Sequence, residues 1–385
     1  MNIGILFPRS NAHPLIGSEF TEALKAFLKK EGLGDAVNIH SESVGFGGVE
    51  KEVYGKAEKL LLMDNVDILI GFIDQKILEL IKPLIQASGK LFILVNPGAN
   101  HSLNWVPQEN IITLCLQHSF LCALSGSIAA ESGGKEIPGA AASSFYDCGY
   151  LHLSSITNEF TASGGKTMYH YINKQTYNDE FSIQELTGFL EANPSVTTLL
   201  CVFDSLPASL FYKMLNQYEH AQQLQLFVSP MMLEKKALGN VDKPFHFTIN
   251  GYLPWHLSVP NSENSSFIQF YREHYRKDPG IFSLLGWEAG IIIKEIALSM
   301  ETGYTTGINV IDLLKTKKIS SPRGVLELDA TTQYFTSPVI RCTIPAGSPV
   351  TELEFNIDAQ NEWEQFTEKT TDGVVSGWTN TYLCY

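Results

Sequence analysis

The sequence is poor in basic residues and has no long hydrophobic run. Its 385 residues include 27 Lys or Arg against 41 Asp or Glu, which gives a formal net charge of −14 at pH 7. Because a negatively charged surface repels phosphate backbones, the composition argues against nucleic acid as a partner. No stretch approaches the roughly 18 consecutive apolar residues of a membrane helix, so direct membrane insertion is not expected.

The cysteines and histidines lack the spacing of a metal or redox site. None of the six cysteines belongs to a C-x-x-C pair, and the ten histidines are scattered. Zinc needs clustered ligands, so we expect no metal and no cofactor. Cys115, Cys122 and Cys201 stand inside apolar runs, where a thiol behaves as a small hydrophobe, so we expect buried thiols. A Cys342–Cys384 disulfide is compatible with the sequence without being required.

Motifs of the common enzyme classes are also missing. Gly45-Phe46-Gly47-Gly48 follows a predicted strand, but it lacks the G-x-G-x-x-G spacing and the lysine–hydroxyl pair of a phosphate loop. No Gly-x-Ser-x-Gly elbow is present, and no histidine pair has the spacing of a metalloprotease helix. We therefore expect no catalytic residues and no enzyme activity.

Residues 1–7 do not form a signal peptide. The segment has no basic start and only a short apolar run, which is typical of a buried first strand. Two locations stay open: the cytoplasm, or the periplasm or cell envelope if a leader has been removed.

The sequence does contain a regular alternation of strand-length apolar runs and amphipathic helical stretches. Strands are predicted at 3–7, 37–42, 67–71, 91–95, 111–115, 137–143, 167–172, 197–203, 224–229, 246–250, 325–328, 338–344 and 352–355. Helices are predicted at 21–30, 49–63, 75–87, 119–130, 205–218, 261–276 and 281–300. This alternation indicates an α/β fold with mainly parallel sheets and helices on both faces.

The pattern breaks at three places. It restarts after 111–115, changes near 247–252 and becomes β-rich after Arg323-Gly324. We therefore predict two doubly wound, Rossmann-like lobes joined by three hinge crossovers, near 115–120, 247–252 and 328–336. Lobe 1 would comprise 1–118 and 250–331, and lobe 2 would comprise 119–249 and 332–385. Two lobes joined in this way suggest a hinged clamp that holds a ligand between them.

Five segments then carry a resemblance, in order and together over most of residues 1–345. They are Gly45–Gly71, which ends in Asp64-Asn65-Val66-Asp67-Ile68-Leu69-Ile70-Gly71, then Phe92–Asn100, Phe145–Tyr150 followed by Gly164-Gly165-Lys166, Pro279–Ala289 and Gly324–Asp329. As a set they resemble the type I periplasmic solute-binding proteins of the branched-chain amino-acid and amide family of ABC transporters, the leucine/isoleucine/valine-binding proteins among them.

The resemblance implies an extracytoplasmic protein without catalysis. It would capture a small polar ligand, such as an amino acid, an amide or a related amine, and deliver it to a membrane ABC permease. A ligand-sensing regulator built on the same clamp is the alternative, and a small-molecule enzyme is a third reading.

Ligands of parallel sheets bind at the carboxyl ends of the strands, and the resemblance implies further ligand positions at Tyr146, Tyr150 and Glu288. The candidate ligand-binding residues are selected on both grounds. They are Arg9, Ser10, Asp74, Gln75, Asn96, Gly98, Ala99, Asn100, Tyr146, Tyr150, Asp204, Trp255 and Glu288. Most of them have a structural alternative: Asp74 and Asp204 as helix caps, Asn96–Asn100 as a turn, Tyr146 and Tyr150 as packing residues, and Trp255 as a core residue.

Charge gives a first indication of the ligand. Asp74, Asp147, Asp204 and Glu288 are all expected near the ligand, and Arg9 is the one basic residue expected to match them. Unpaired carboxylates are costly away from water, so we favour a ligand with an amine or several hydroxyls. A ligand carboxylate would be held by Arg9, Ser10 or backbone amides at 98–100. Glu288 would pair either with a ligand cation or with a basic side chain of the protein.

Overall fold

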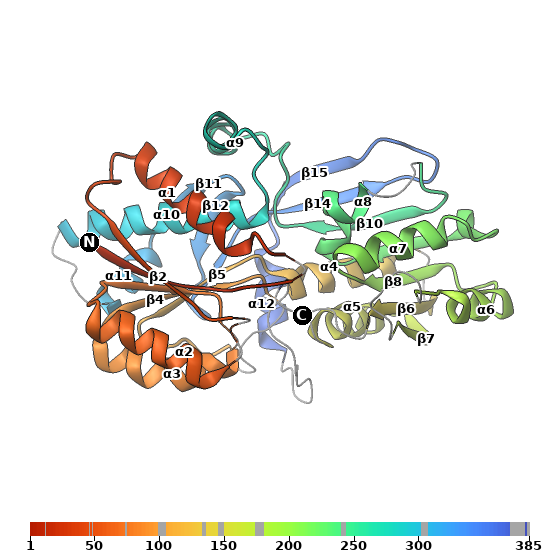
Figure 1. Ribbon diagram of the computed structural model, residues 1–385. Helices are drawn as coiled ribbons and strands as arrows, with labels where there is room; N and C mark the ends of the chain where they lie inside the picture. Colours follow the sequence, from red (N-terminus) through yellow and green to blue (C-terminus); the bar gives the residue numbers. More distant parts are fainter. Residues whose placement is uncertain are drawn as a thin grey trace. The chain divides into compact units, whose positions relative to one another are not determined.

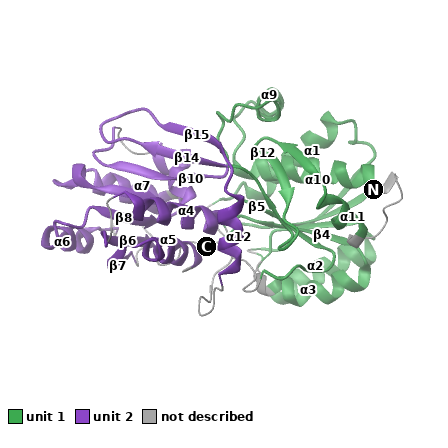
Figure 2. Cartoon of the chain, turned by 180° about the vertical axis from the view of Figure 1, so that it is seen from behind, with its two compact units in different colours: residues 1–116, 255–338, 382–385 green, residues 117–254, 339–381 purple. Residues whose placement is uncertain are grey.

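A computed structural model describes residues 1–11, 13–45, 47, 49–73, 75–98, 105–132, 136–144, 150–173, 181–239, 244–301, 307–369 and 382. The chain divides into two compact units (Figure 2). Unit 1 comprises Met1–Leu116, Trp255–Pro338 and Tyr382–Tyr385, and unit 2 comprises Gln117–Pro254 and Val339–Thr381. The chain thus passes between the units after Leu116, after Pro254 and after Pro338, which we call the first, second and third crossovers, and it returns to unit 1 at Tyr382.

Unit 1 is built on an eight-stranded sheet. The strand order is β11 (Lys318–Ser321), β12 (Gly324–Leu328), β13 (Tyr334–Thr336), β5 (Ile111–Cys115), β4 (Leu91–Asn96), β3 (Ile68–Gly71), β1 (Asn2–Phe7) and β2 (Asn38–Ser43). The strands from β13 to β2 are parallel, and β11 and β12 add an antiparallel hairpin. β3, β4 and β5 are buried along their whole length because helices cover both faces of the sheet.

The helices of unit 1 lie in two layers (Figure 1). α1 (Ile16–Lys30) packs against α10 (Ile281–Glu301) on one face of the sheet. α2 (Glu50–Glu58), with a π-helical turn at Lys59–Met63, and α3 (Gln75–Ser88) cover the other face. α9 (Ser262–Tyr275) and α11 (Gly307–Leu314) complete the unit.

Unit 2 is built on a seven-stranded sheet. The order is β15 (Glu352–Ile357), β14 (Val339–Ile344), β10 (Thr248–Leu253), β9 (Gln225–Val228), β8 (Thr198–Val202), β6 (Pro138–Ser144) and β7 (Lys166–Asn173). The strands from β10 to β7 are parallel, and β14 and β15 are antiparallel additions at one edge. Both sheets are therefore parallel-dominated, which confirms the predicted α/β fold class.

The helices of unit 2 also cover both faces of its sheet. α4 (His118–Glu131) and α5 (Tyr150–Ala162) pack side by side on one face, and α7 (Ser205–Leu215) lies on the other (Figure 1). Unit 2 also contains α6 (Gln184–Ala192) and the short α8 (Lys235–Leu238) before the third crossover. After it, α12 (Gln360–Glu368) packs on α4, with Trp363 buried and edge-on to Phe120 at 5.4 Å between ring centroids.

The third crossover differs from the sequence-based expectation. That expectation assigned residues 332–385 to the second lobe, whereas β13 pairs with β5 and β12 and so belongs to unit 1. β13 is only three residues long, which is too short for a period-2 pattern to reveal. The other two crossovers fall after Leu116 and Pro254, against expected lobe boundaries after residues 118 and 249.

Four cysteines, Cys115, Cys122, Cys201 and Cys342, are buried thiols, while Cys148 and Cys384 lie outside the described residues. Burial raises the pKa of Cys122 and Cys201 well above the usual thiol value, so both are inert. Within the described part of the chain, no helix has the length and apolar character needed to cross a bilayer.

Candidate functional site

In unit 1, a hydrogen bond joins the loops that follow β1 and β2 at the carboxyl ends of these strands. The backbone N–H of Arg9, after β1, donates to the carbonyl of Gly45, after β2, at 2.6 Å. The Arg9 side chain is exposed, whereas Ser10 is buried and its Oγ accepts from the backbone N–H of His13 at 3.1 Å. Arg9 and Ser10 thus follow β1 at the carboxyl edge of the sheet.

The end of β4 forms a tight turn. Asn96 is buried, and its Oδ1 accepts from the backbone N–H of Gly98 at 2.8 Å. Gly98 has a φ of +97°, a conformation that favours glycine. This is the turn chemistry considered in the sequence, and it holds the Gly98 amide at the same edge as Arg9 and Ser10.

Asp74, Ala99, Asn100, Tyr146 and Asp147 lie outside the described residues, as do the side chains of Gln75 and Tyr150, which begin α3 and α5.

In unit 2, Asp204 follows β8 at the carboxyl edge of the sheet. It is 9% exposed and occupies the N-cap position of α7 with an extended backbone. Ser229 follows the neighbouring strand β9 and is fully buried. Sequence reasoning did not single out Ser229, because a serine after a strand is common in ordinary turns.

Trp255 is a residue of the protein interior. It is 8% exposed, and its indole Nε1 donates to Oδ1 of Asn264 at 2.9 Å. Its ring lies 5.9 Å from that of Phe267, measured between centroids. These surroundings agree with the alternative that Trp255 is a core residue.

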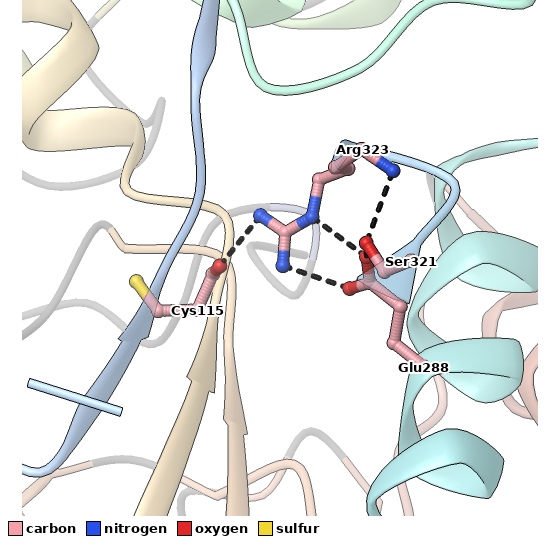
Figure 3. Close-up of polar contacts among 4 residues, drawn as sticks. All are labelled: Cys115, Glu288, Ser321 and Arg323. Atoms are coloured by element: carbon pink, nitrogen blue, oxygen red, sulfur yellow. Dashed lines mark hydrogen bonds and ion pairs between the residues drawn. The ribbon is translucent and has the colours of Figure 1, made fainter. Parts of the chain in front are cut away.

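Glu288 pairs with a basic side chain of the protein (Figure 3). Its Oε2 accepts from Nη2 of Arg323 at 2.7 Å, and its Oε1 accepts from Arg323 Nε at 2.9 Å and from Ser321 Oγ at 3.0 Å. The side chains of Arg323 and Glu288 are both 0% exposed. The expectation that Arg9 is the one basic residue available to pair with the acidic candidates is thus wrong for Glu288, because Arg323 pairs with it. Arg323 stands in a Ser-Pro-Arg-Gly turn, a setting in which an arginine is usually exposed, so no local pattern indicated its burial.

The fold also brings two of the scattered histidines together. His118 begins α4 and His152 lies in the first turn of α5, and their ring centroids are 5.9 Å apart. Both are buried, at 1% and 0% exposure. Since α4 and α5 are separate helices, no local spacing could have indicated this pair. Among the described residues, no group of three or more potential ligands is arranged to hold a metal ion.

Comparison with known proteins agrees with this architecture. A family model described as periplasmic binding protein matches residues 1–345, so the chain belongs to the periplasmic binding protein family. The resemblance seen in the sequence is thereby confirmed. No curated protein matches the chain.

Solved structures of low identity share the fold. An ABC transporter substrate-binding protein from Sphaerobacter thermophilus is 14% identical with a TM-score of 0.76, over 93% of this chain and 98% of that one. A solute-binding protein from Rhodopseudomonas palustris BisB5, in complex with 3,4-dihydroxybenzoic acid, is 16% identical with a TM-score of 0.71, over 94% and 99%. LivJ from Streptococcus pneumoniae, in complex with isoleucine, is 13% identical with a TM-score of 0.66, over 92% and 99%.

Proposed function

We propose that this protein is the extracytoplasmic solute-binding component of an ABC transporter, and that it captures a small polar ligand without transforming it. The observation that carries the proposal is the family match over residues 1–345, together with two α/β units joined by three crossovers. We also infer delivery to a membrane permease and a location in the periplasm or cell envelope, and the same family membership supports both.

The described loops support a ligand that carries both an anionic and a cationic or hydroxyl group. In unit 1, the exposed Arg9 guanidinium and the hydroxyl of the buried Ser10 provide donors for a carboxylate. In unit 2, Asp204 provides an acceptor for an ammonium or hydroxyl group. An amino acid carries both kinds of group, and an amide or a related amine carries the second kind. Asp74, Gln75, Ala99, Asn100, Tyr146 and Tyr150 stay in the proposed ligand set.

A thermal-shift screen tests the proposal directly. The library should contain amino acids, amides, polyamines, sugars and nucleosides, with isoleucine and hydroxybenzoates included because structurally similar proteins bind them. A ligand at 100 times its Kd adds about 2.7 kcal/mol of stability, which is a clear rise in Tm. Turnover of the ligand during incubation, or no shift with any compound, would contradict a pure binding role.

Two substitutions then test the ligand set. Arg9→Ala should weaken binding of a carboxylate ligand, and Asp204→Asn should weaken binding of an amine, each by about 1.5 kcal/mol or roughly tenfold in Kd. Arg276→Ala, at an exposed arginine that ends α9, is the matched control. Calorimetric titration should leave that control unchanged. If the hit is a simple dicarboxylate that binds Asp204→Asn as tightly as the parent, the assignment of an amine-holding site is wrong.

A further inference from the structure

The turn between β11 and β12 contacts segments that lie next to two crossovers. This 321–324 turn runs from Ser321 to Gly324, which pair with each other at the end of the hairpin. It is also close in the chain to the third crossover, because β12 begins at Gly324 and pairs with β13, the last strand before Pro338. All of the contacts described below lie within unit 1.

The first crossover is held by Arg323. Its Nη1 donates to the carbonyl of Cys115, the last residue of β5, at 3.0 Å (Figure 3). The next residue, Leu116, donates its N–H to the backbone carbonyl of Asn96 at 3.2 Å and is the last residue of unit 1 before the first crossover. Gln117 then takes a left-handed conformation with a φ of +57° as the chain enters unit 2.

The guanidinium that holds Cys115 is itself fixed. Glu288 on α10 accepts from both Nε and Nη2, so the pair is bidentate, and both side chains are completely buried. Replacing such a buried pair by apolar side chains is often neutral or stabilising, so stability alone does not account for it. The geometry of the pair does fix the direction of the third guanidinium nitrogen, Nη1, whose N–H points at the carbonyl of Cys115 at the end of β5.

The second crossover is linked to the same turn through α9. Trp255, the first residue after the crossover, donates to Asn264, and the Asn264 amide donates to the carbonyls of Leu257 and Val259 at 3.0 and 2.9 Å. Asn261 accepts from the backbone N–H of Asn264 at 2.6 Å. The Asn261 side chain in turn donates to Ser321 and Pro322 carbonyls at 3.4 and 3.3 Å.

We propose that the 321–324 turn is the hinge anchor of unit 1: Arg323 and Asn261 hold the first and second crossovers in place, so that bending begins beyond them, at Gln117 and before Trp255. Hinge motions are absorbed by a few residues at the ends of rigid elements, and rigid supports are what confine them there. The role of this anchor in ligand binding rests on the proposed function. The anchoring itself can be measured without any ligand.

Hydrogen exchange on the ligand-free, full-length protein tests the anchor. The double substitution Glu288→Leu with Arg323→Met removes the buried pair and the bond to Cys115, and keeps apolar packing. We expect exchange of the Leu116 amide to rise at least tenfold, with exchange of Ile5 and Ile70 in β1 and β3 unchanged. Glu31→Leu with Lys294→Met, which removes an ion pair between α10 and the residue following α1 at 2.6 Å, is the matched control and should leave Leu116 unchanged.

A second variant keeps the test decisive if the double variant does not fold. Asn261→Asp retains the oxygen that caps α9 but loses the donors to Ser321 and Pro322. Exchange of the Val259 amide, which donates to His256 at 3.1 Å, should then rise while Leu116 is unaffected. Unchanged exchange at both crossovers, or an equal rise in β1 and β3, would overturn the anchor. A failed ligand screen would leave this result intact.

Discussion

His256 lies in the second crossover, where burial lowers its pKa below the ordinary value of 6.5. Its side chain is half-buried, and its Nδ1 accepts from the backbone N–H of Ser258 at 3.1 Å. The unfolded chain therefore binds this proton at a higher pH than the folded protein does. By linkage, the free energy of unfolding falls as the pH drops through 6.5 toward the folded-state pKa.

We predict that His256→Asn reduces this loss of stability on acidification. Asparagine keeps an acceptor near the Nδ1 position and does not titrate. Urea unfolding at pH 7.5 and 5.5 should show a smaller difference in the variant than in the parent protein. His246→Asn, at an exposed histidine of unit 2, controls for effects unrelated to burial. Equal pH dependence in the His256 variant and the parent would assign the effect to other groups.

At the scale of helices, two glycines permit backbone contact between neighbouring elements. A Cβ on Gly286 of α10 would lie 2.0 Å from the carbonyl oxygen of Phe20 on α1. A Cβ on Gly126 of α4 would lie 2.2 Å from the carbonyl oxygen of Ile156 on α5. These are backbone atoms, so the helices themselves would have to move apart.

We predict that Gly286→Ala and Gly126→Ala each lower the free energy of unfolding by about 1–3 kcal/mol, the usual cost of overpacking. This loss would occur although alanine has the better helix propensity, by about 1 kcal/mol. Gly188→Ala on α6 is the matched control, because nothing lies within 4 Å of its Cβ position, and it should stabilise the protein. Chemical denaturation of the three variants distinguishes the effects. If all three are stabilising, the helices are not in backbone contact at these glycines.

Much of the fold at this scale was predictable from the sequence, and the reason is physical. Buried parallel strands read as continuous apolar runs, as in Leu91–Asn96, and long helices have clear periodicity. β13 and the polar α12 lack such patterns and were not predicted. The site was less predictable: Arg9 and Ser10 follow from strand order, whereas Arg323 depends on α10 and β5 meeting at one turn, which only the tertiary structure provides.

At the scale of the whole chain, the C-terminal region involves both units. The match to the periplasmic binding protein family ends at residue 345. Beyond it, β15 and α12 belong to unit 2, whereas Tyr382 belongs to unit 1. Tyr382 is 1% exposed. Its ring lies edge-on to His13, at 4.9 Å between centroids, and to Phe282, at 5.1 Å. The backbone N–H of His13 donates to Ser10 Oγ, so Tyr382 contacts the loop that carries Ser10, which is proposed to bind ligand.

We therefore predict that Tyr382→Ala destabilises unit 1 by about 1–3 kcal/mol, in the range of ordinary core losses, and loosens the loop after β1. Hydrogen exchange should speed up at the His13 amide and leave the β8 and β9 amides of unit 2 unchanged. Tyr382→Phe retains the ring contacts and should behave as the parent protein, as should Tyr54→Ala on the exposed side of α2. An unchanged His13 amide would mean that the loop is ordered without it.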